Sequence, residues 1–323
     1  MISAFDVDVL IPVRDGARFL PACLDSVFAQ TLPARAVIAV DDGSTDETPR
    51  ILAEYQRRSS NLQVIRSDPR GVSHARNLGL AASQAPFVAF LDSDDIWRPD
   101  KLAKQMALFA ADRPQVGFVH CAYFCIDEDG RRVSTGRLIP PRKRGDVFVD
   151  LLQGYALSGS ASAVVARRDL VTAAGGFDES LFHGEDWDLW IRMAKLSHVD
   201  FVADALTGIR VHPLGRGQRR KARSGPELFL IERLRIVGKW IDLVPDNGRI
   251  LDRCRIEAVR VGVKNALLRF PPRLGLRRRL HASDVPLARR LFPTRRMYVR
   301  SVILAVADQI QRSTGKQPSA AAY

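Results

Sequence analysis

A short apolar segment runs directly into three aspartates in the sequence Phe87-Val88-Ala89-Phe90-Leu91-Asp92-Ser93-Asp94-Asp95. An apolar run of this length, bounded by Pro86 and by acids, predicts a fully buried β-strand. A second apolar run, Ala36–Val40, passes in the same way into Asp41-Asp42-Gly43-Ser44-Thr45-Asp46. The carboxyl ends of parallel strands are where open sheets bind their ligands. The sequence therefore predicts that both acidic groups lie at one ligand-binding edge.

Strand-like and helix-like segments alternate on both sides of these stretches. The strands we expect are Val7–Val13, Ala36–Val40, Leu62–Arg66, Phe87–Leu91, Val116–Ile126, Ala161–Ala166 and Phe201–Val211. The helices we expect are Ala17–Ala29, Val72–Ser83, Pro99–Ala111 and Glu185–Leu196, with one more to about Arg58 that begins at a capping box of Ser44 and Glu47. This alternation predicts an α/β fold whose central sheet is mostly parallel and flanked by helices.

Charge divides the chain into two regions. Residues 1–215 hold 24 Lys and Arg against 28 Asp and Glu, whereas residues 216–323 hold 25 against 8, so the net charge of +13 comes from the second region. We expect a domain over 1–215 and a basic, mainly helical extension over 216–323, with helices near 227–241, 250–269 and 295–312. The extension predicts either an anionic membrane surface as partner or an arginine-rich subdomain packed on the first domain. No nucleic-acid-binding motif is present.

The cluster at the end of Phe87–Leu91 has two interpretations. Three adjacent carboxylates raise one another's affinity for protons, and a hard divalent cation bound by Asp92-x-Asp94 relieves that repulsion. The alternative is an acidic turn that leads into a helix near Pro99. The segment Asp42–Glu47 likewise has the composition of a turn and helix start, and it can still present Asp42 to a ligand.

A third feature is the sequence His183-Gly184-Glu185-Asp186-Trp187-Asp188. Acids at a helix start are favoured by the helix dipole, which explains them without any catalytic role. A carboxylate beside apolar Trp187 can also act as a general base that takes the proton of a hydroxyl nucleophile. Trp187 and Trp190 have the spacing of a helix core face, or one of them, or Trp97, stacks on the apolar face of a ligand.

Five motifs in this order resemble the family 2 glycosyltransferases with the GT-A fold. Besides the two acidic stretches, the resemblance rests on Val9-Leu10-Ile11-Pro12-Val13-Arg14-Asp15, Gly71-Val72-Ser73-His74-Ala75-Arg76-Asn77 and Gly184-Glu185-Asp186-Trp187-Asp188-Leu189-Trp190. It spans about Phe5 to Pro213. It implies a GT-A nucleotide-sugar-binding domain with the helical region as a carboxyl-terminal extension.

The resemblance also implies a role for each matching residue. Pro12, Arg14 and Asp42 match contacts to the nucleobase, and Arg76 lies in the segment that approaches the base or the diphosphate. Asp92 matches a ribose or sugar contact, and Asp94 matches the metal-binding acid. Asp186 matches the base that deprotonates the acceptor. His212 resembles a histidine that reaches the metal or diphosphate in some members, although a lone histidine is more often structural.

The function that follows from the resemblance is an inverting, metal-dependent glycosyltransferase of polysaccharide biosynthesis at the cell envelope. It would use Mg²⁺ or Mn²⁺ and pass a sugar from a nucleotide-sugar, with UDP as the expected nucleotide, to a glycan or lipid-linked acceptor. The alternative is a catalytically silent nucleotide-sugar-binding or scaffold protein at the membrane, against which the joint presence of Asp42, Asp94 and Asp186 argues.

The remaining sequence features bear on location and on competing enzyme classes. We expect a cytoplasmic protein, peripheral on the inner face of the membrane if the basic region docks there, because no membrane-spanning segment, signal peptide or disulfide pattern is visible. The dinucleotide-binding and P-loop signatures are absent as well, which disfavours a dehydrogenase or a P-loop NTPase.

Overall fold

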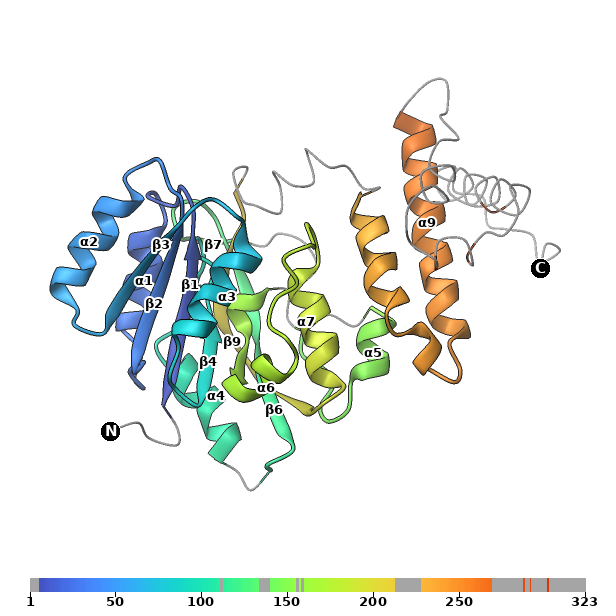
Figure 1. Ribbon diagram of the computed structural model, residues 1–323, viewed down its shortest axis with the longest axis horizontal. Helices are drawn as coiled ribbons and strands as arrows, with labels where there is room; N and C mark the ends of the chain where they lie inside the picture. The colour runs from blue at the N-terminus through green and yellow to red at the C-terminus, as the bar shows by residue number, and fades with distance from the viewer. Residues whose placement is uncertain are drawn as a thin grey trace. The chain divides into compact units, whose positions relative to one another are not determined.

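The chain separates into two compact units, Met1–Arg219 and Arg220–Tyr323 (Figure 1). The computed structural model describes residues 6–110, 113–133, 140–154, 157, 160–212, 228–268, 287, 291 and 301, without the side chains of 260 and 262–268. The boundary expected after residue 215 falls in residues 213–227, which lie outside this description, as does most of the helix expected over 295–312.

One mixed sheet forms the centre of the first unit. Its strands are β1 Val7–Val13, β2 Ala36–Asp42, β3 Leu62–Ser67, β4 Phe87–Phe90, β5 Ile96–Trp97, β6 Val116–Ile126, β7 Arg132–Val133, β8 Val165–Arg167 and β9 His198–Arg210. They follow the order β3-β2-β1-β4-β8-β6-β9-β5, and β7 pairs with β6. The half from β3 to β4 is parallel, as the sequence predicts.

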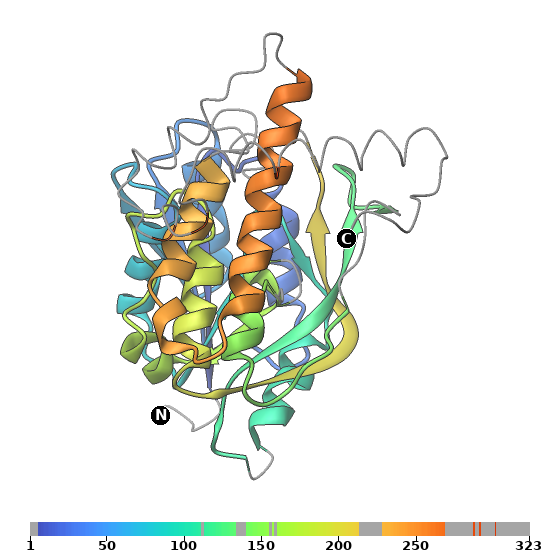
Figure 2. The same cartoon turned by 90° about the vertical axis from the view of Figure 1, so that its right-hand side faces the viewer.

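The second half of the sheet differs from the expected parallel arrangement. Strand β8 runs antiparallel to both of its neighbours, β4 and β6, and β5 runs antiparallel to β9. The long strands β6 and β9 pair in parallel with register shifts, and Figure 2 shows them in green and yellow beside the helices. The short β8 arises because Ala161–Ala163, expected as strand, forms a turn of 3₁₀ helix.

Helices cover both faces of the sheet. They are α1 Leu20–Phe28, α2 Thr48–Arg58, α3 Val72–Ala82, α4 Lys101–Ala110, α5 Phe148–Leu152, α6 Arg168–Ala173 and α7 Glu185–Ala194. Side chains alternate between the faces of a strand. The odd-numbered residues of β1, such as Val9 and Ile11, share one core with α1, α2 and α4. The opposite face, which carries Leu10, packs on α3.

Helix α3 packs on the sheet at Gly79. A Cβ atom on Gly79 would lie 3.5 Å from side-chain atoms of both Leu10 and Val40. Helix α3 thus packs against β1 and β2 at once, and its first turn reaches the carboxyl ends of these strands. This placement matters for the site, because Gly71, Arg76 and Asn77 belong to α3 or its N-cap.

The capping box expected at Ser44 is wrong. Helix α2 begins at Thr48, and its first amide is capped by Asp46, whose Oδ1 accepts a 2.9 Å hydrogen bond from Thr48 N. Ser44 does not cap the helix because its hydroxyl accepts a 2.9 Å bond from the amide of Asp15. The side chain is therefore used for tertiary contact between two loops.

The described part of the second unit is helical, as expected. It contains a helix over 228–238, a 3₁₀ turn at Ile241–Leu243 and the helix α9 Gly248–Leu268. An ion pair of 2.7 Å joins Arg233 to Glu257. Three large apolar side chains are about half exposed: Phe229, Leu243 and Ile256. Among the described residues, no helix is both long and apolar enough for a membrane crossing.

A buried acid ties the amino-terminal edge of the sheet together. Asp8 is fully buried and accepts hydrogen bonds from Arg35 Nε at 2.8 Å, Ser83 Oγ at 2.8 Å and the amides of Gln84 and Ala85. Burial acts to raise the pKa of Asp8, but these donors outweigh burial and the pKa is lowered. A carboxyl with a depressed pKa stabilises the fold above its unfolded pKa, and this stabilisation is lost as the pH falls.

We expect Asp8→Asn to lower the free energy of unfolding by about 3 kcal/mol at pH 7, because it leaves the partly buried guanidinium of Arg35 without its charged partner. Asp204→Asn is the matched control, since Asp204 is 55% exposed in its pair with Lys104, and its effect should stay below about 1 kcal/mol. Urea unfolding measures both. The difference between wild type and Asp8→Asn should shrink below about pH 4, and a difference that grows there would contradict this account.

Candidate active site

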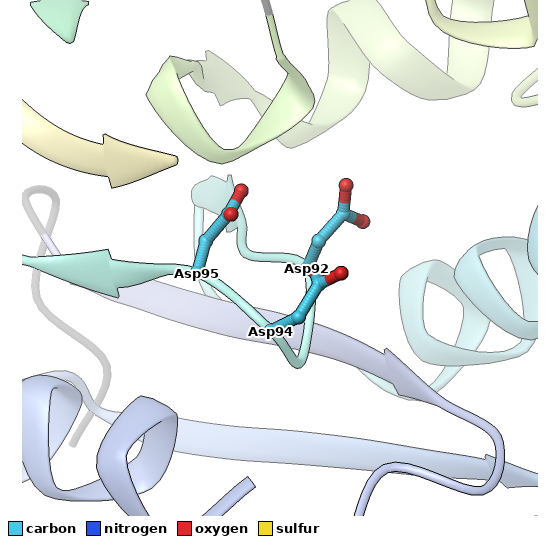
Figure 3. A group of neighbouring side chains, drawn as sticks. All are labelled: Asp92, Asp94 and Asp95. Atoms are coloured by element: carbon cyan, nitrogen blue, oxygen red, sulfur yellow. The ribbon is translucent and has the colours of Figure 1, made fainter. Parts of the chain in front are cut away.

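The loop that joins β4 to β5, called the acidic loop below, presents the three carboxylates of Asp92, Asp94 and Asp95 on one side, as Figure 3 shows. One oxygen from each of Asp92, Asp94 and Asp95 can be chosen so that all three lie within 4.8 Å of one another. Asp92 and Asp94 are partly exposed, whereas Asp95 is buried. The two partly exposed acids can therefore meet a ligand, while Asp95 faces the protein.

Asp95 anchors the loop to two other segments. Its Oδ1 accepts a 2.9 Å bond from Arg210 N at the end of β9, and its Oδ2 accepts a 2.6 Å bond from Ser162 Oγ. The same Ser162 hydroxyl accepts the amide of Asp92 at 3.0 Å. Burial, and then the charges of Asp94 and Asp92, raise the pKa of Asp95 well above its ordinary value. Asp95 therefore holds a proton more readily than an ordinary aspartate does.

His212 lies against Asp94, with 3.1 Å between its Nε2 and Asp94 Oδ2. The ring is buried and is held edge-on by Phe19, with 4.6 Å between ring centroids. Its Nδ1 is also buried and has no hydrogen-bond partner among the described residues. Asp94, with His212 beside it and Asp92 in the same loop, offers oxygen and imidazole donors that fit a cation such as Mn²⁺.

Arg210 fixes the strand end from which His212 follows. Its Nε donates to the carbonyl of Asp94 at 2.8 Å, and one Nη donates to the carbonyls of Asp127 and Glu128. The guanidinium lies 4.6 Å from the ring centroid of Phe19. The acidic loop, the end of β9 and the turn after β6 are thereby held as one piece.

Asp42, at the end of β2, is buried and holds the start of α3. Its Oδ1 accepts the amide of Arg70 at 2.8 Å, and its Oδ2 accepts the amide of Gly71 at 2.9 Å. A carboxylate oxygen has two lone pairs, so the carboxylate keeps capacity for a further donor such as an imide N–H. These backbone bonds fix its orientation in advance.

The loop after β1, which carries Arg14, is bonded to the loop after β2. The amides of Asp15, Gly16 and Ala17 donate to Ser44 Oγ, Thr48 Oγ1 and Asp46 Oδ2 at 2.9 to 3.0 Å. In return, Asp15 Oδ1 accepts the amide of Thr45 at 2.8 Å. Asp15 has φ of 48°, a left-handed conformation that aspartate tolerates better than most residues. Pro12 is buried and Arg14 is exposed, so Arg14 is the one placed to meet a ligand.

Arg76 is buried between two acids from distant parts of the chain. One Nη donates to Asp92 Oδ1 at 2.8 Å, and the other lies 3.3 Å from Glu185 Oε1. Its side chain is only 3% exposed and lies over the ring of Phe177. The resemblance implies that Arg76 lies in the segment that approaches the base or the diphosphate. In this structure its side chain joins the acidic loop to the start of α7.

Asp186 follows Glu185 in the first turn of α7, after Gly184 in a left-handed conformation. Burial, and then the charge of Glu185, raise the pKa of Asp186 to about 6, against the lowering effect of Arg76. Its Oδ1 accepts the amide of Trp187 at 2.7 Å. A carboxylate with a pKa near 6 suits a general base at neutral pH.

Of the three tryptophans considered for sugar stacking, two are excluded. Trp190 is core, stacked on Phe118 with 6.2 Å between centroids. Trp97 is buried, its Nε1 donates to Ser162 O at 2.8 Å, and Lys101 Nζ lies 4.0 Å from its ring centroid. Trp187 is partly exposed. The sequence missed the anchoring roles of Ser162, Glu185 and Arg210, because their partners are remote in the chain.

The sequence matches the glycosyl transferase family 2 over residues 8–166, which include β1 to β4 and the acidic loop. Residues 8–166 are a family 2 glycosyltransferase domain. The family predicted from the five motifs is therefore confirmed.

Curated relatives are glycosyltransferases too. An uncharacterized glycosyltransferase of Rickettsia prowazekii (strain Madrid E) is 26% identical over 206 residues, which are 64% of each protein. The chondroitin synthase of Escherichia coli is 26% identical over 190 residues, which are 59% of this chain and 26% of the synthase. The chain thus spans less than two thirds of these relatives.

Solved structures show the same fold. The structure of S. aureus TarS residues 1–349 in complex with UDP-GlcNAc has a TM-score of 0.70 at 17% identity and covers 97% of this chain and 93% of that one. A second structure of the same TarS segment gives a TM-score of 0.65. The GT-A fold class, with helices around a curled mixed sheet, is confirmed.

Proposed function

We propose that the glycosyltransferase domain transfers a sugar from a nucleotide-sugar, with UDP as the nucleotide, to a hydroxyl of a glycan or lipid-linked saccharide with inversion. The observation that carries this proposal is the Arg76 bridge, which joins Asp92 of the acidic loop to Glu185, the neighbour of Asp186. A cation-binding cluster and a carboxylate of raised pKa are thereby connected through a single side chain.

The donor half of this proposal rests on the bonded loops after β1 and β2. Asp42, held by the amides of Arg70 and Gly71, would accept the imide N–H of uracil, and exposed Arg14 would approach the nucleotide. Asp92 would contact the ribose or sugar. TarS, which shares the fold, was solved with UDP-GlcNAc, and this favours a UDP-sugar as the first donor to test.

Asp94 and His212, with Asp92 beside them, would hold a divalent cation. When bound, such an ion offsets negative charge on the diphosphate leaving group. The residues of this chain do the rest. Asp186 takes the proton of the acceptor hydroxyl and thereby makes it nucleophilic, and the sugar passes in a single displacement that inverts the anomeric carbon. No second nucleophile is required.

Asp186→Asn should reduce turnover by about 10²–10⁴-fold, because the amide cannot take the acceptor proton. Donor binding should stay near the wild-type value. The matched control is Asp169→Asn in the first turn of α6, whose Oδ1 accepts the amide of Leu170 at 2.7 Å in the same local geometry. UDP release from a panel of UDP-sugars and acceptors measures turnover.

The pH profile provides a second measurement on Asp186. The wild-type rate should rise with pH through about 6 and level off above it, since only the deprotonated carboxylate is a base. Near-wild-type turnover of Asp186→Asn at neutral pH would remove Asp186 from the mechanism. Donor binding without turnover of any donor and acceptor by the wild type would instead favour the scaffold protein.

Asp94→Ala should abolish the dependence of UDP binding on Mn²⁺ in calorimetry, because it removes the carboxylate of the acidic loop that contacts His212. Asp129→Ala is the control, since Asp129 is an exposed acid in the turn after β6 and should leave the Mn²⁺ effect unchanged. Equal UDP affinity of the wild type with and without Mn²⁺ would contradict the cation assignment.

For the carboxyl-terminal region, we propose a peripheral position on an anionic membrane, which would bring the domain to a lipid-linked acceptor. The excess of basic residues after residue 215 and the exposed Phe229, Leu243 and Ile256 support this proposal. Basic residues contribute about 1 kcal/mol each near such a surface. The location at the cytoplasmic face belongs to the same proposal.

Replacement of Arg277, Arg278 and Arg279 by Gln in the full chain should weaken sedimentation with phosphatidylglycerol vesicles by at least tenfold, because about 3 kcal/mol of attraction is removed. Arg57→Gln with Arg58→Gln is the control in the first unit and should have no such effect. Vesicle binding that is absent in the wild type, or equal in all variants, would favour a region that only packs on the domain.

A further inference from the structure

Asn77, which follows Arg76 in α3, clamps the backbone of the segment before α7. Its Oδ1 accepts the amide of Phe177 at 2.8 Å, and its Nδ2 donates to the carbonyl of Phe177 at 2.9 Å. The side-chain amide thus pairs with both polar groups of one residue, as a neighbouring strand would. A hydrogen bond of 3.1 Å from Nδ2 to Glu179 adds a third contact.

Two more residues, Arg70 just before α3 and His74 on α3, also hold Glu179. Arg70 Nη donates to its Oε2 at 3.2 Å, and His74 Nδ1 lies 3.2 Å from the same atom. Arg70, His74 and Asn77 are spaced by four and three residues, which places them on one side of a helix and its first turn. Burial acts to raise the pKa of Glu179, but Asn77 and His74 outweigh it and the pKa is lowered.

The two ends of the segment from Phe177 to Glu185 are therefore held by consecutive residues of α3. Asn77 holds the backbone at Phe177, and Arg76 lies 3.3 Å from Glu185. Gly176 permits the close approach, since a Cβ atom there would lie 2.8 Å from Asn77 Oδ1 at a φ of +66°. The ring of Phe177 packs under Arg76 and against Phe90.

The amino-terminal end of α3 is held by Asp42, at the end of β2. Gly71, the N-cap of α3, donates its amide to Asp42. Helix α3 is thus bonded to the residue proposed to bind the nucleobase and, one turn further on, to the segment that leads into the residue proposed as base. The distance between donor and base depends on this helix.

We propose that Asn77 is a positioning residue for Asp186, which it holds in place through residues 177–184. This inference rests on the proposed function of Asp186 as the base. Asn77 ends the motif Gly71–Asn77, in which the resemblance implies a role for Arg76 only. A base displaced by about 1 Å can cost about 100-fold in rate, whereas none of residues 177–184 is proposed to contact the nucleotide itself.

The test is Asn77→Leu, which keeps the size and removes the three hydrogen bonds. We expect kcat for UDP release from UDP-sugars to fall by about 100-fold, while the Kd for UDP with Mn²⁺ and the donor KM stay within about twofold. The matched control is Asn61→Leu, because Asn61 also bonds a remote carbonyl, that of Ala34 at 3.1 Å, at the amino-terminal edge of the sheet. Its kcat should not change.

A second variant disturbs the position of the Asn77 side chain from the side of Gly176. Gly176→Ala puts a methyl group against Asn77 Oδ1 and should reproduce the kcat loss without a change in UDP affinity. Hydrogen exchange gives a readout that needs neither donor nor acceptor: in both variants the amide of Asp188, bonded to Gly184 O at 2.8 Å, should exchange at least tenfold faster than in the Asn61→Leu control.

The outcomes are separable. Unchanged kcat and unchanged exchange in both variants would overturn the proposal that Asn77 positions Asp186. An equal loss of UDP binding in Asn77→Leu also overturns it, because that result would mean a general structural role. If Asp186→Asn is active in the wild-type background, the proposed function of Asp186 fails. Faster exchange confined to α7 would then mean that Asn77 holds the start of α7 although Asp186 is not the base.

Discussion

The arrangement of the site depends on one buried arginine, Arg76. The guanidinium of Arg76 is shut off from solvent and neutralised from two sides by Asp92 and Glu185. A buried charge is tolerated only when it is paired and bonded, so each acid holds the arginine in place and is held by it. Loss of the arginine would leave two neighbouring carboxylates without their shared cation, which costs several kcal/mol. The end of β4 and the start of α7 are therefore not free to vary independently.

The sheet order explains why these distant residues meet. Strand β1 lies between β2 and β4 in the parallel half of the sheet, so the loops that follow these three strands emerge side by side. Gly16, after β1, lies close to Ser93, after β4, since a Cβ atom on this glycine would lie 3.4 Å from the serine hydroxyl. The loops after β1 and β2 and the acidic loop are neighbours because of this strand order. Arg210 and Ser162 then bring in β9 and the 3₁₀ turn.

The sequence predicted the parts with local signals and missed those without them. Val116–Ile126 and the start of α7 at Glu185 were predicted correctly, because apolar runs and acids at a helix start are local patterns. The strand expected at Ala161–Ala166 is found only as the short β8 at Val165–Arg167, and its antiparallel pairing was not predicted, because pairing is set by tertiary context. Ser44 has the spacing of a cap, but Asp15 offers its hydroxyl a better partner. The acidic residues themselves were found, whereas the side chains that aim them were not, because each contact joins positions far apart in the chain.

The buried Asp8 lies at the opposite edge of the sheet from every acid of the site. Its donors, Arg35 and the turn at Ser83 to Ala85, belong to segments that contact no ligand-binding loop through it. The molecule thus has a second stabilising polar network, apart from the one around Arg76, at the edge of the sheet away from the candidate site. A substitution in the loops around that site leaves the bonds of Asp8 intact. This half of the scaffold can therefore stay folded while those loops change.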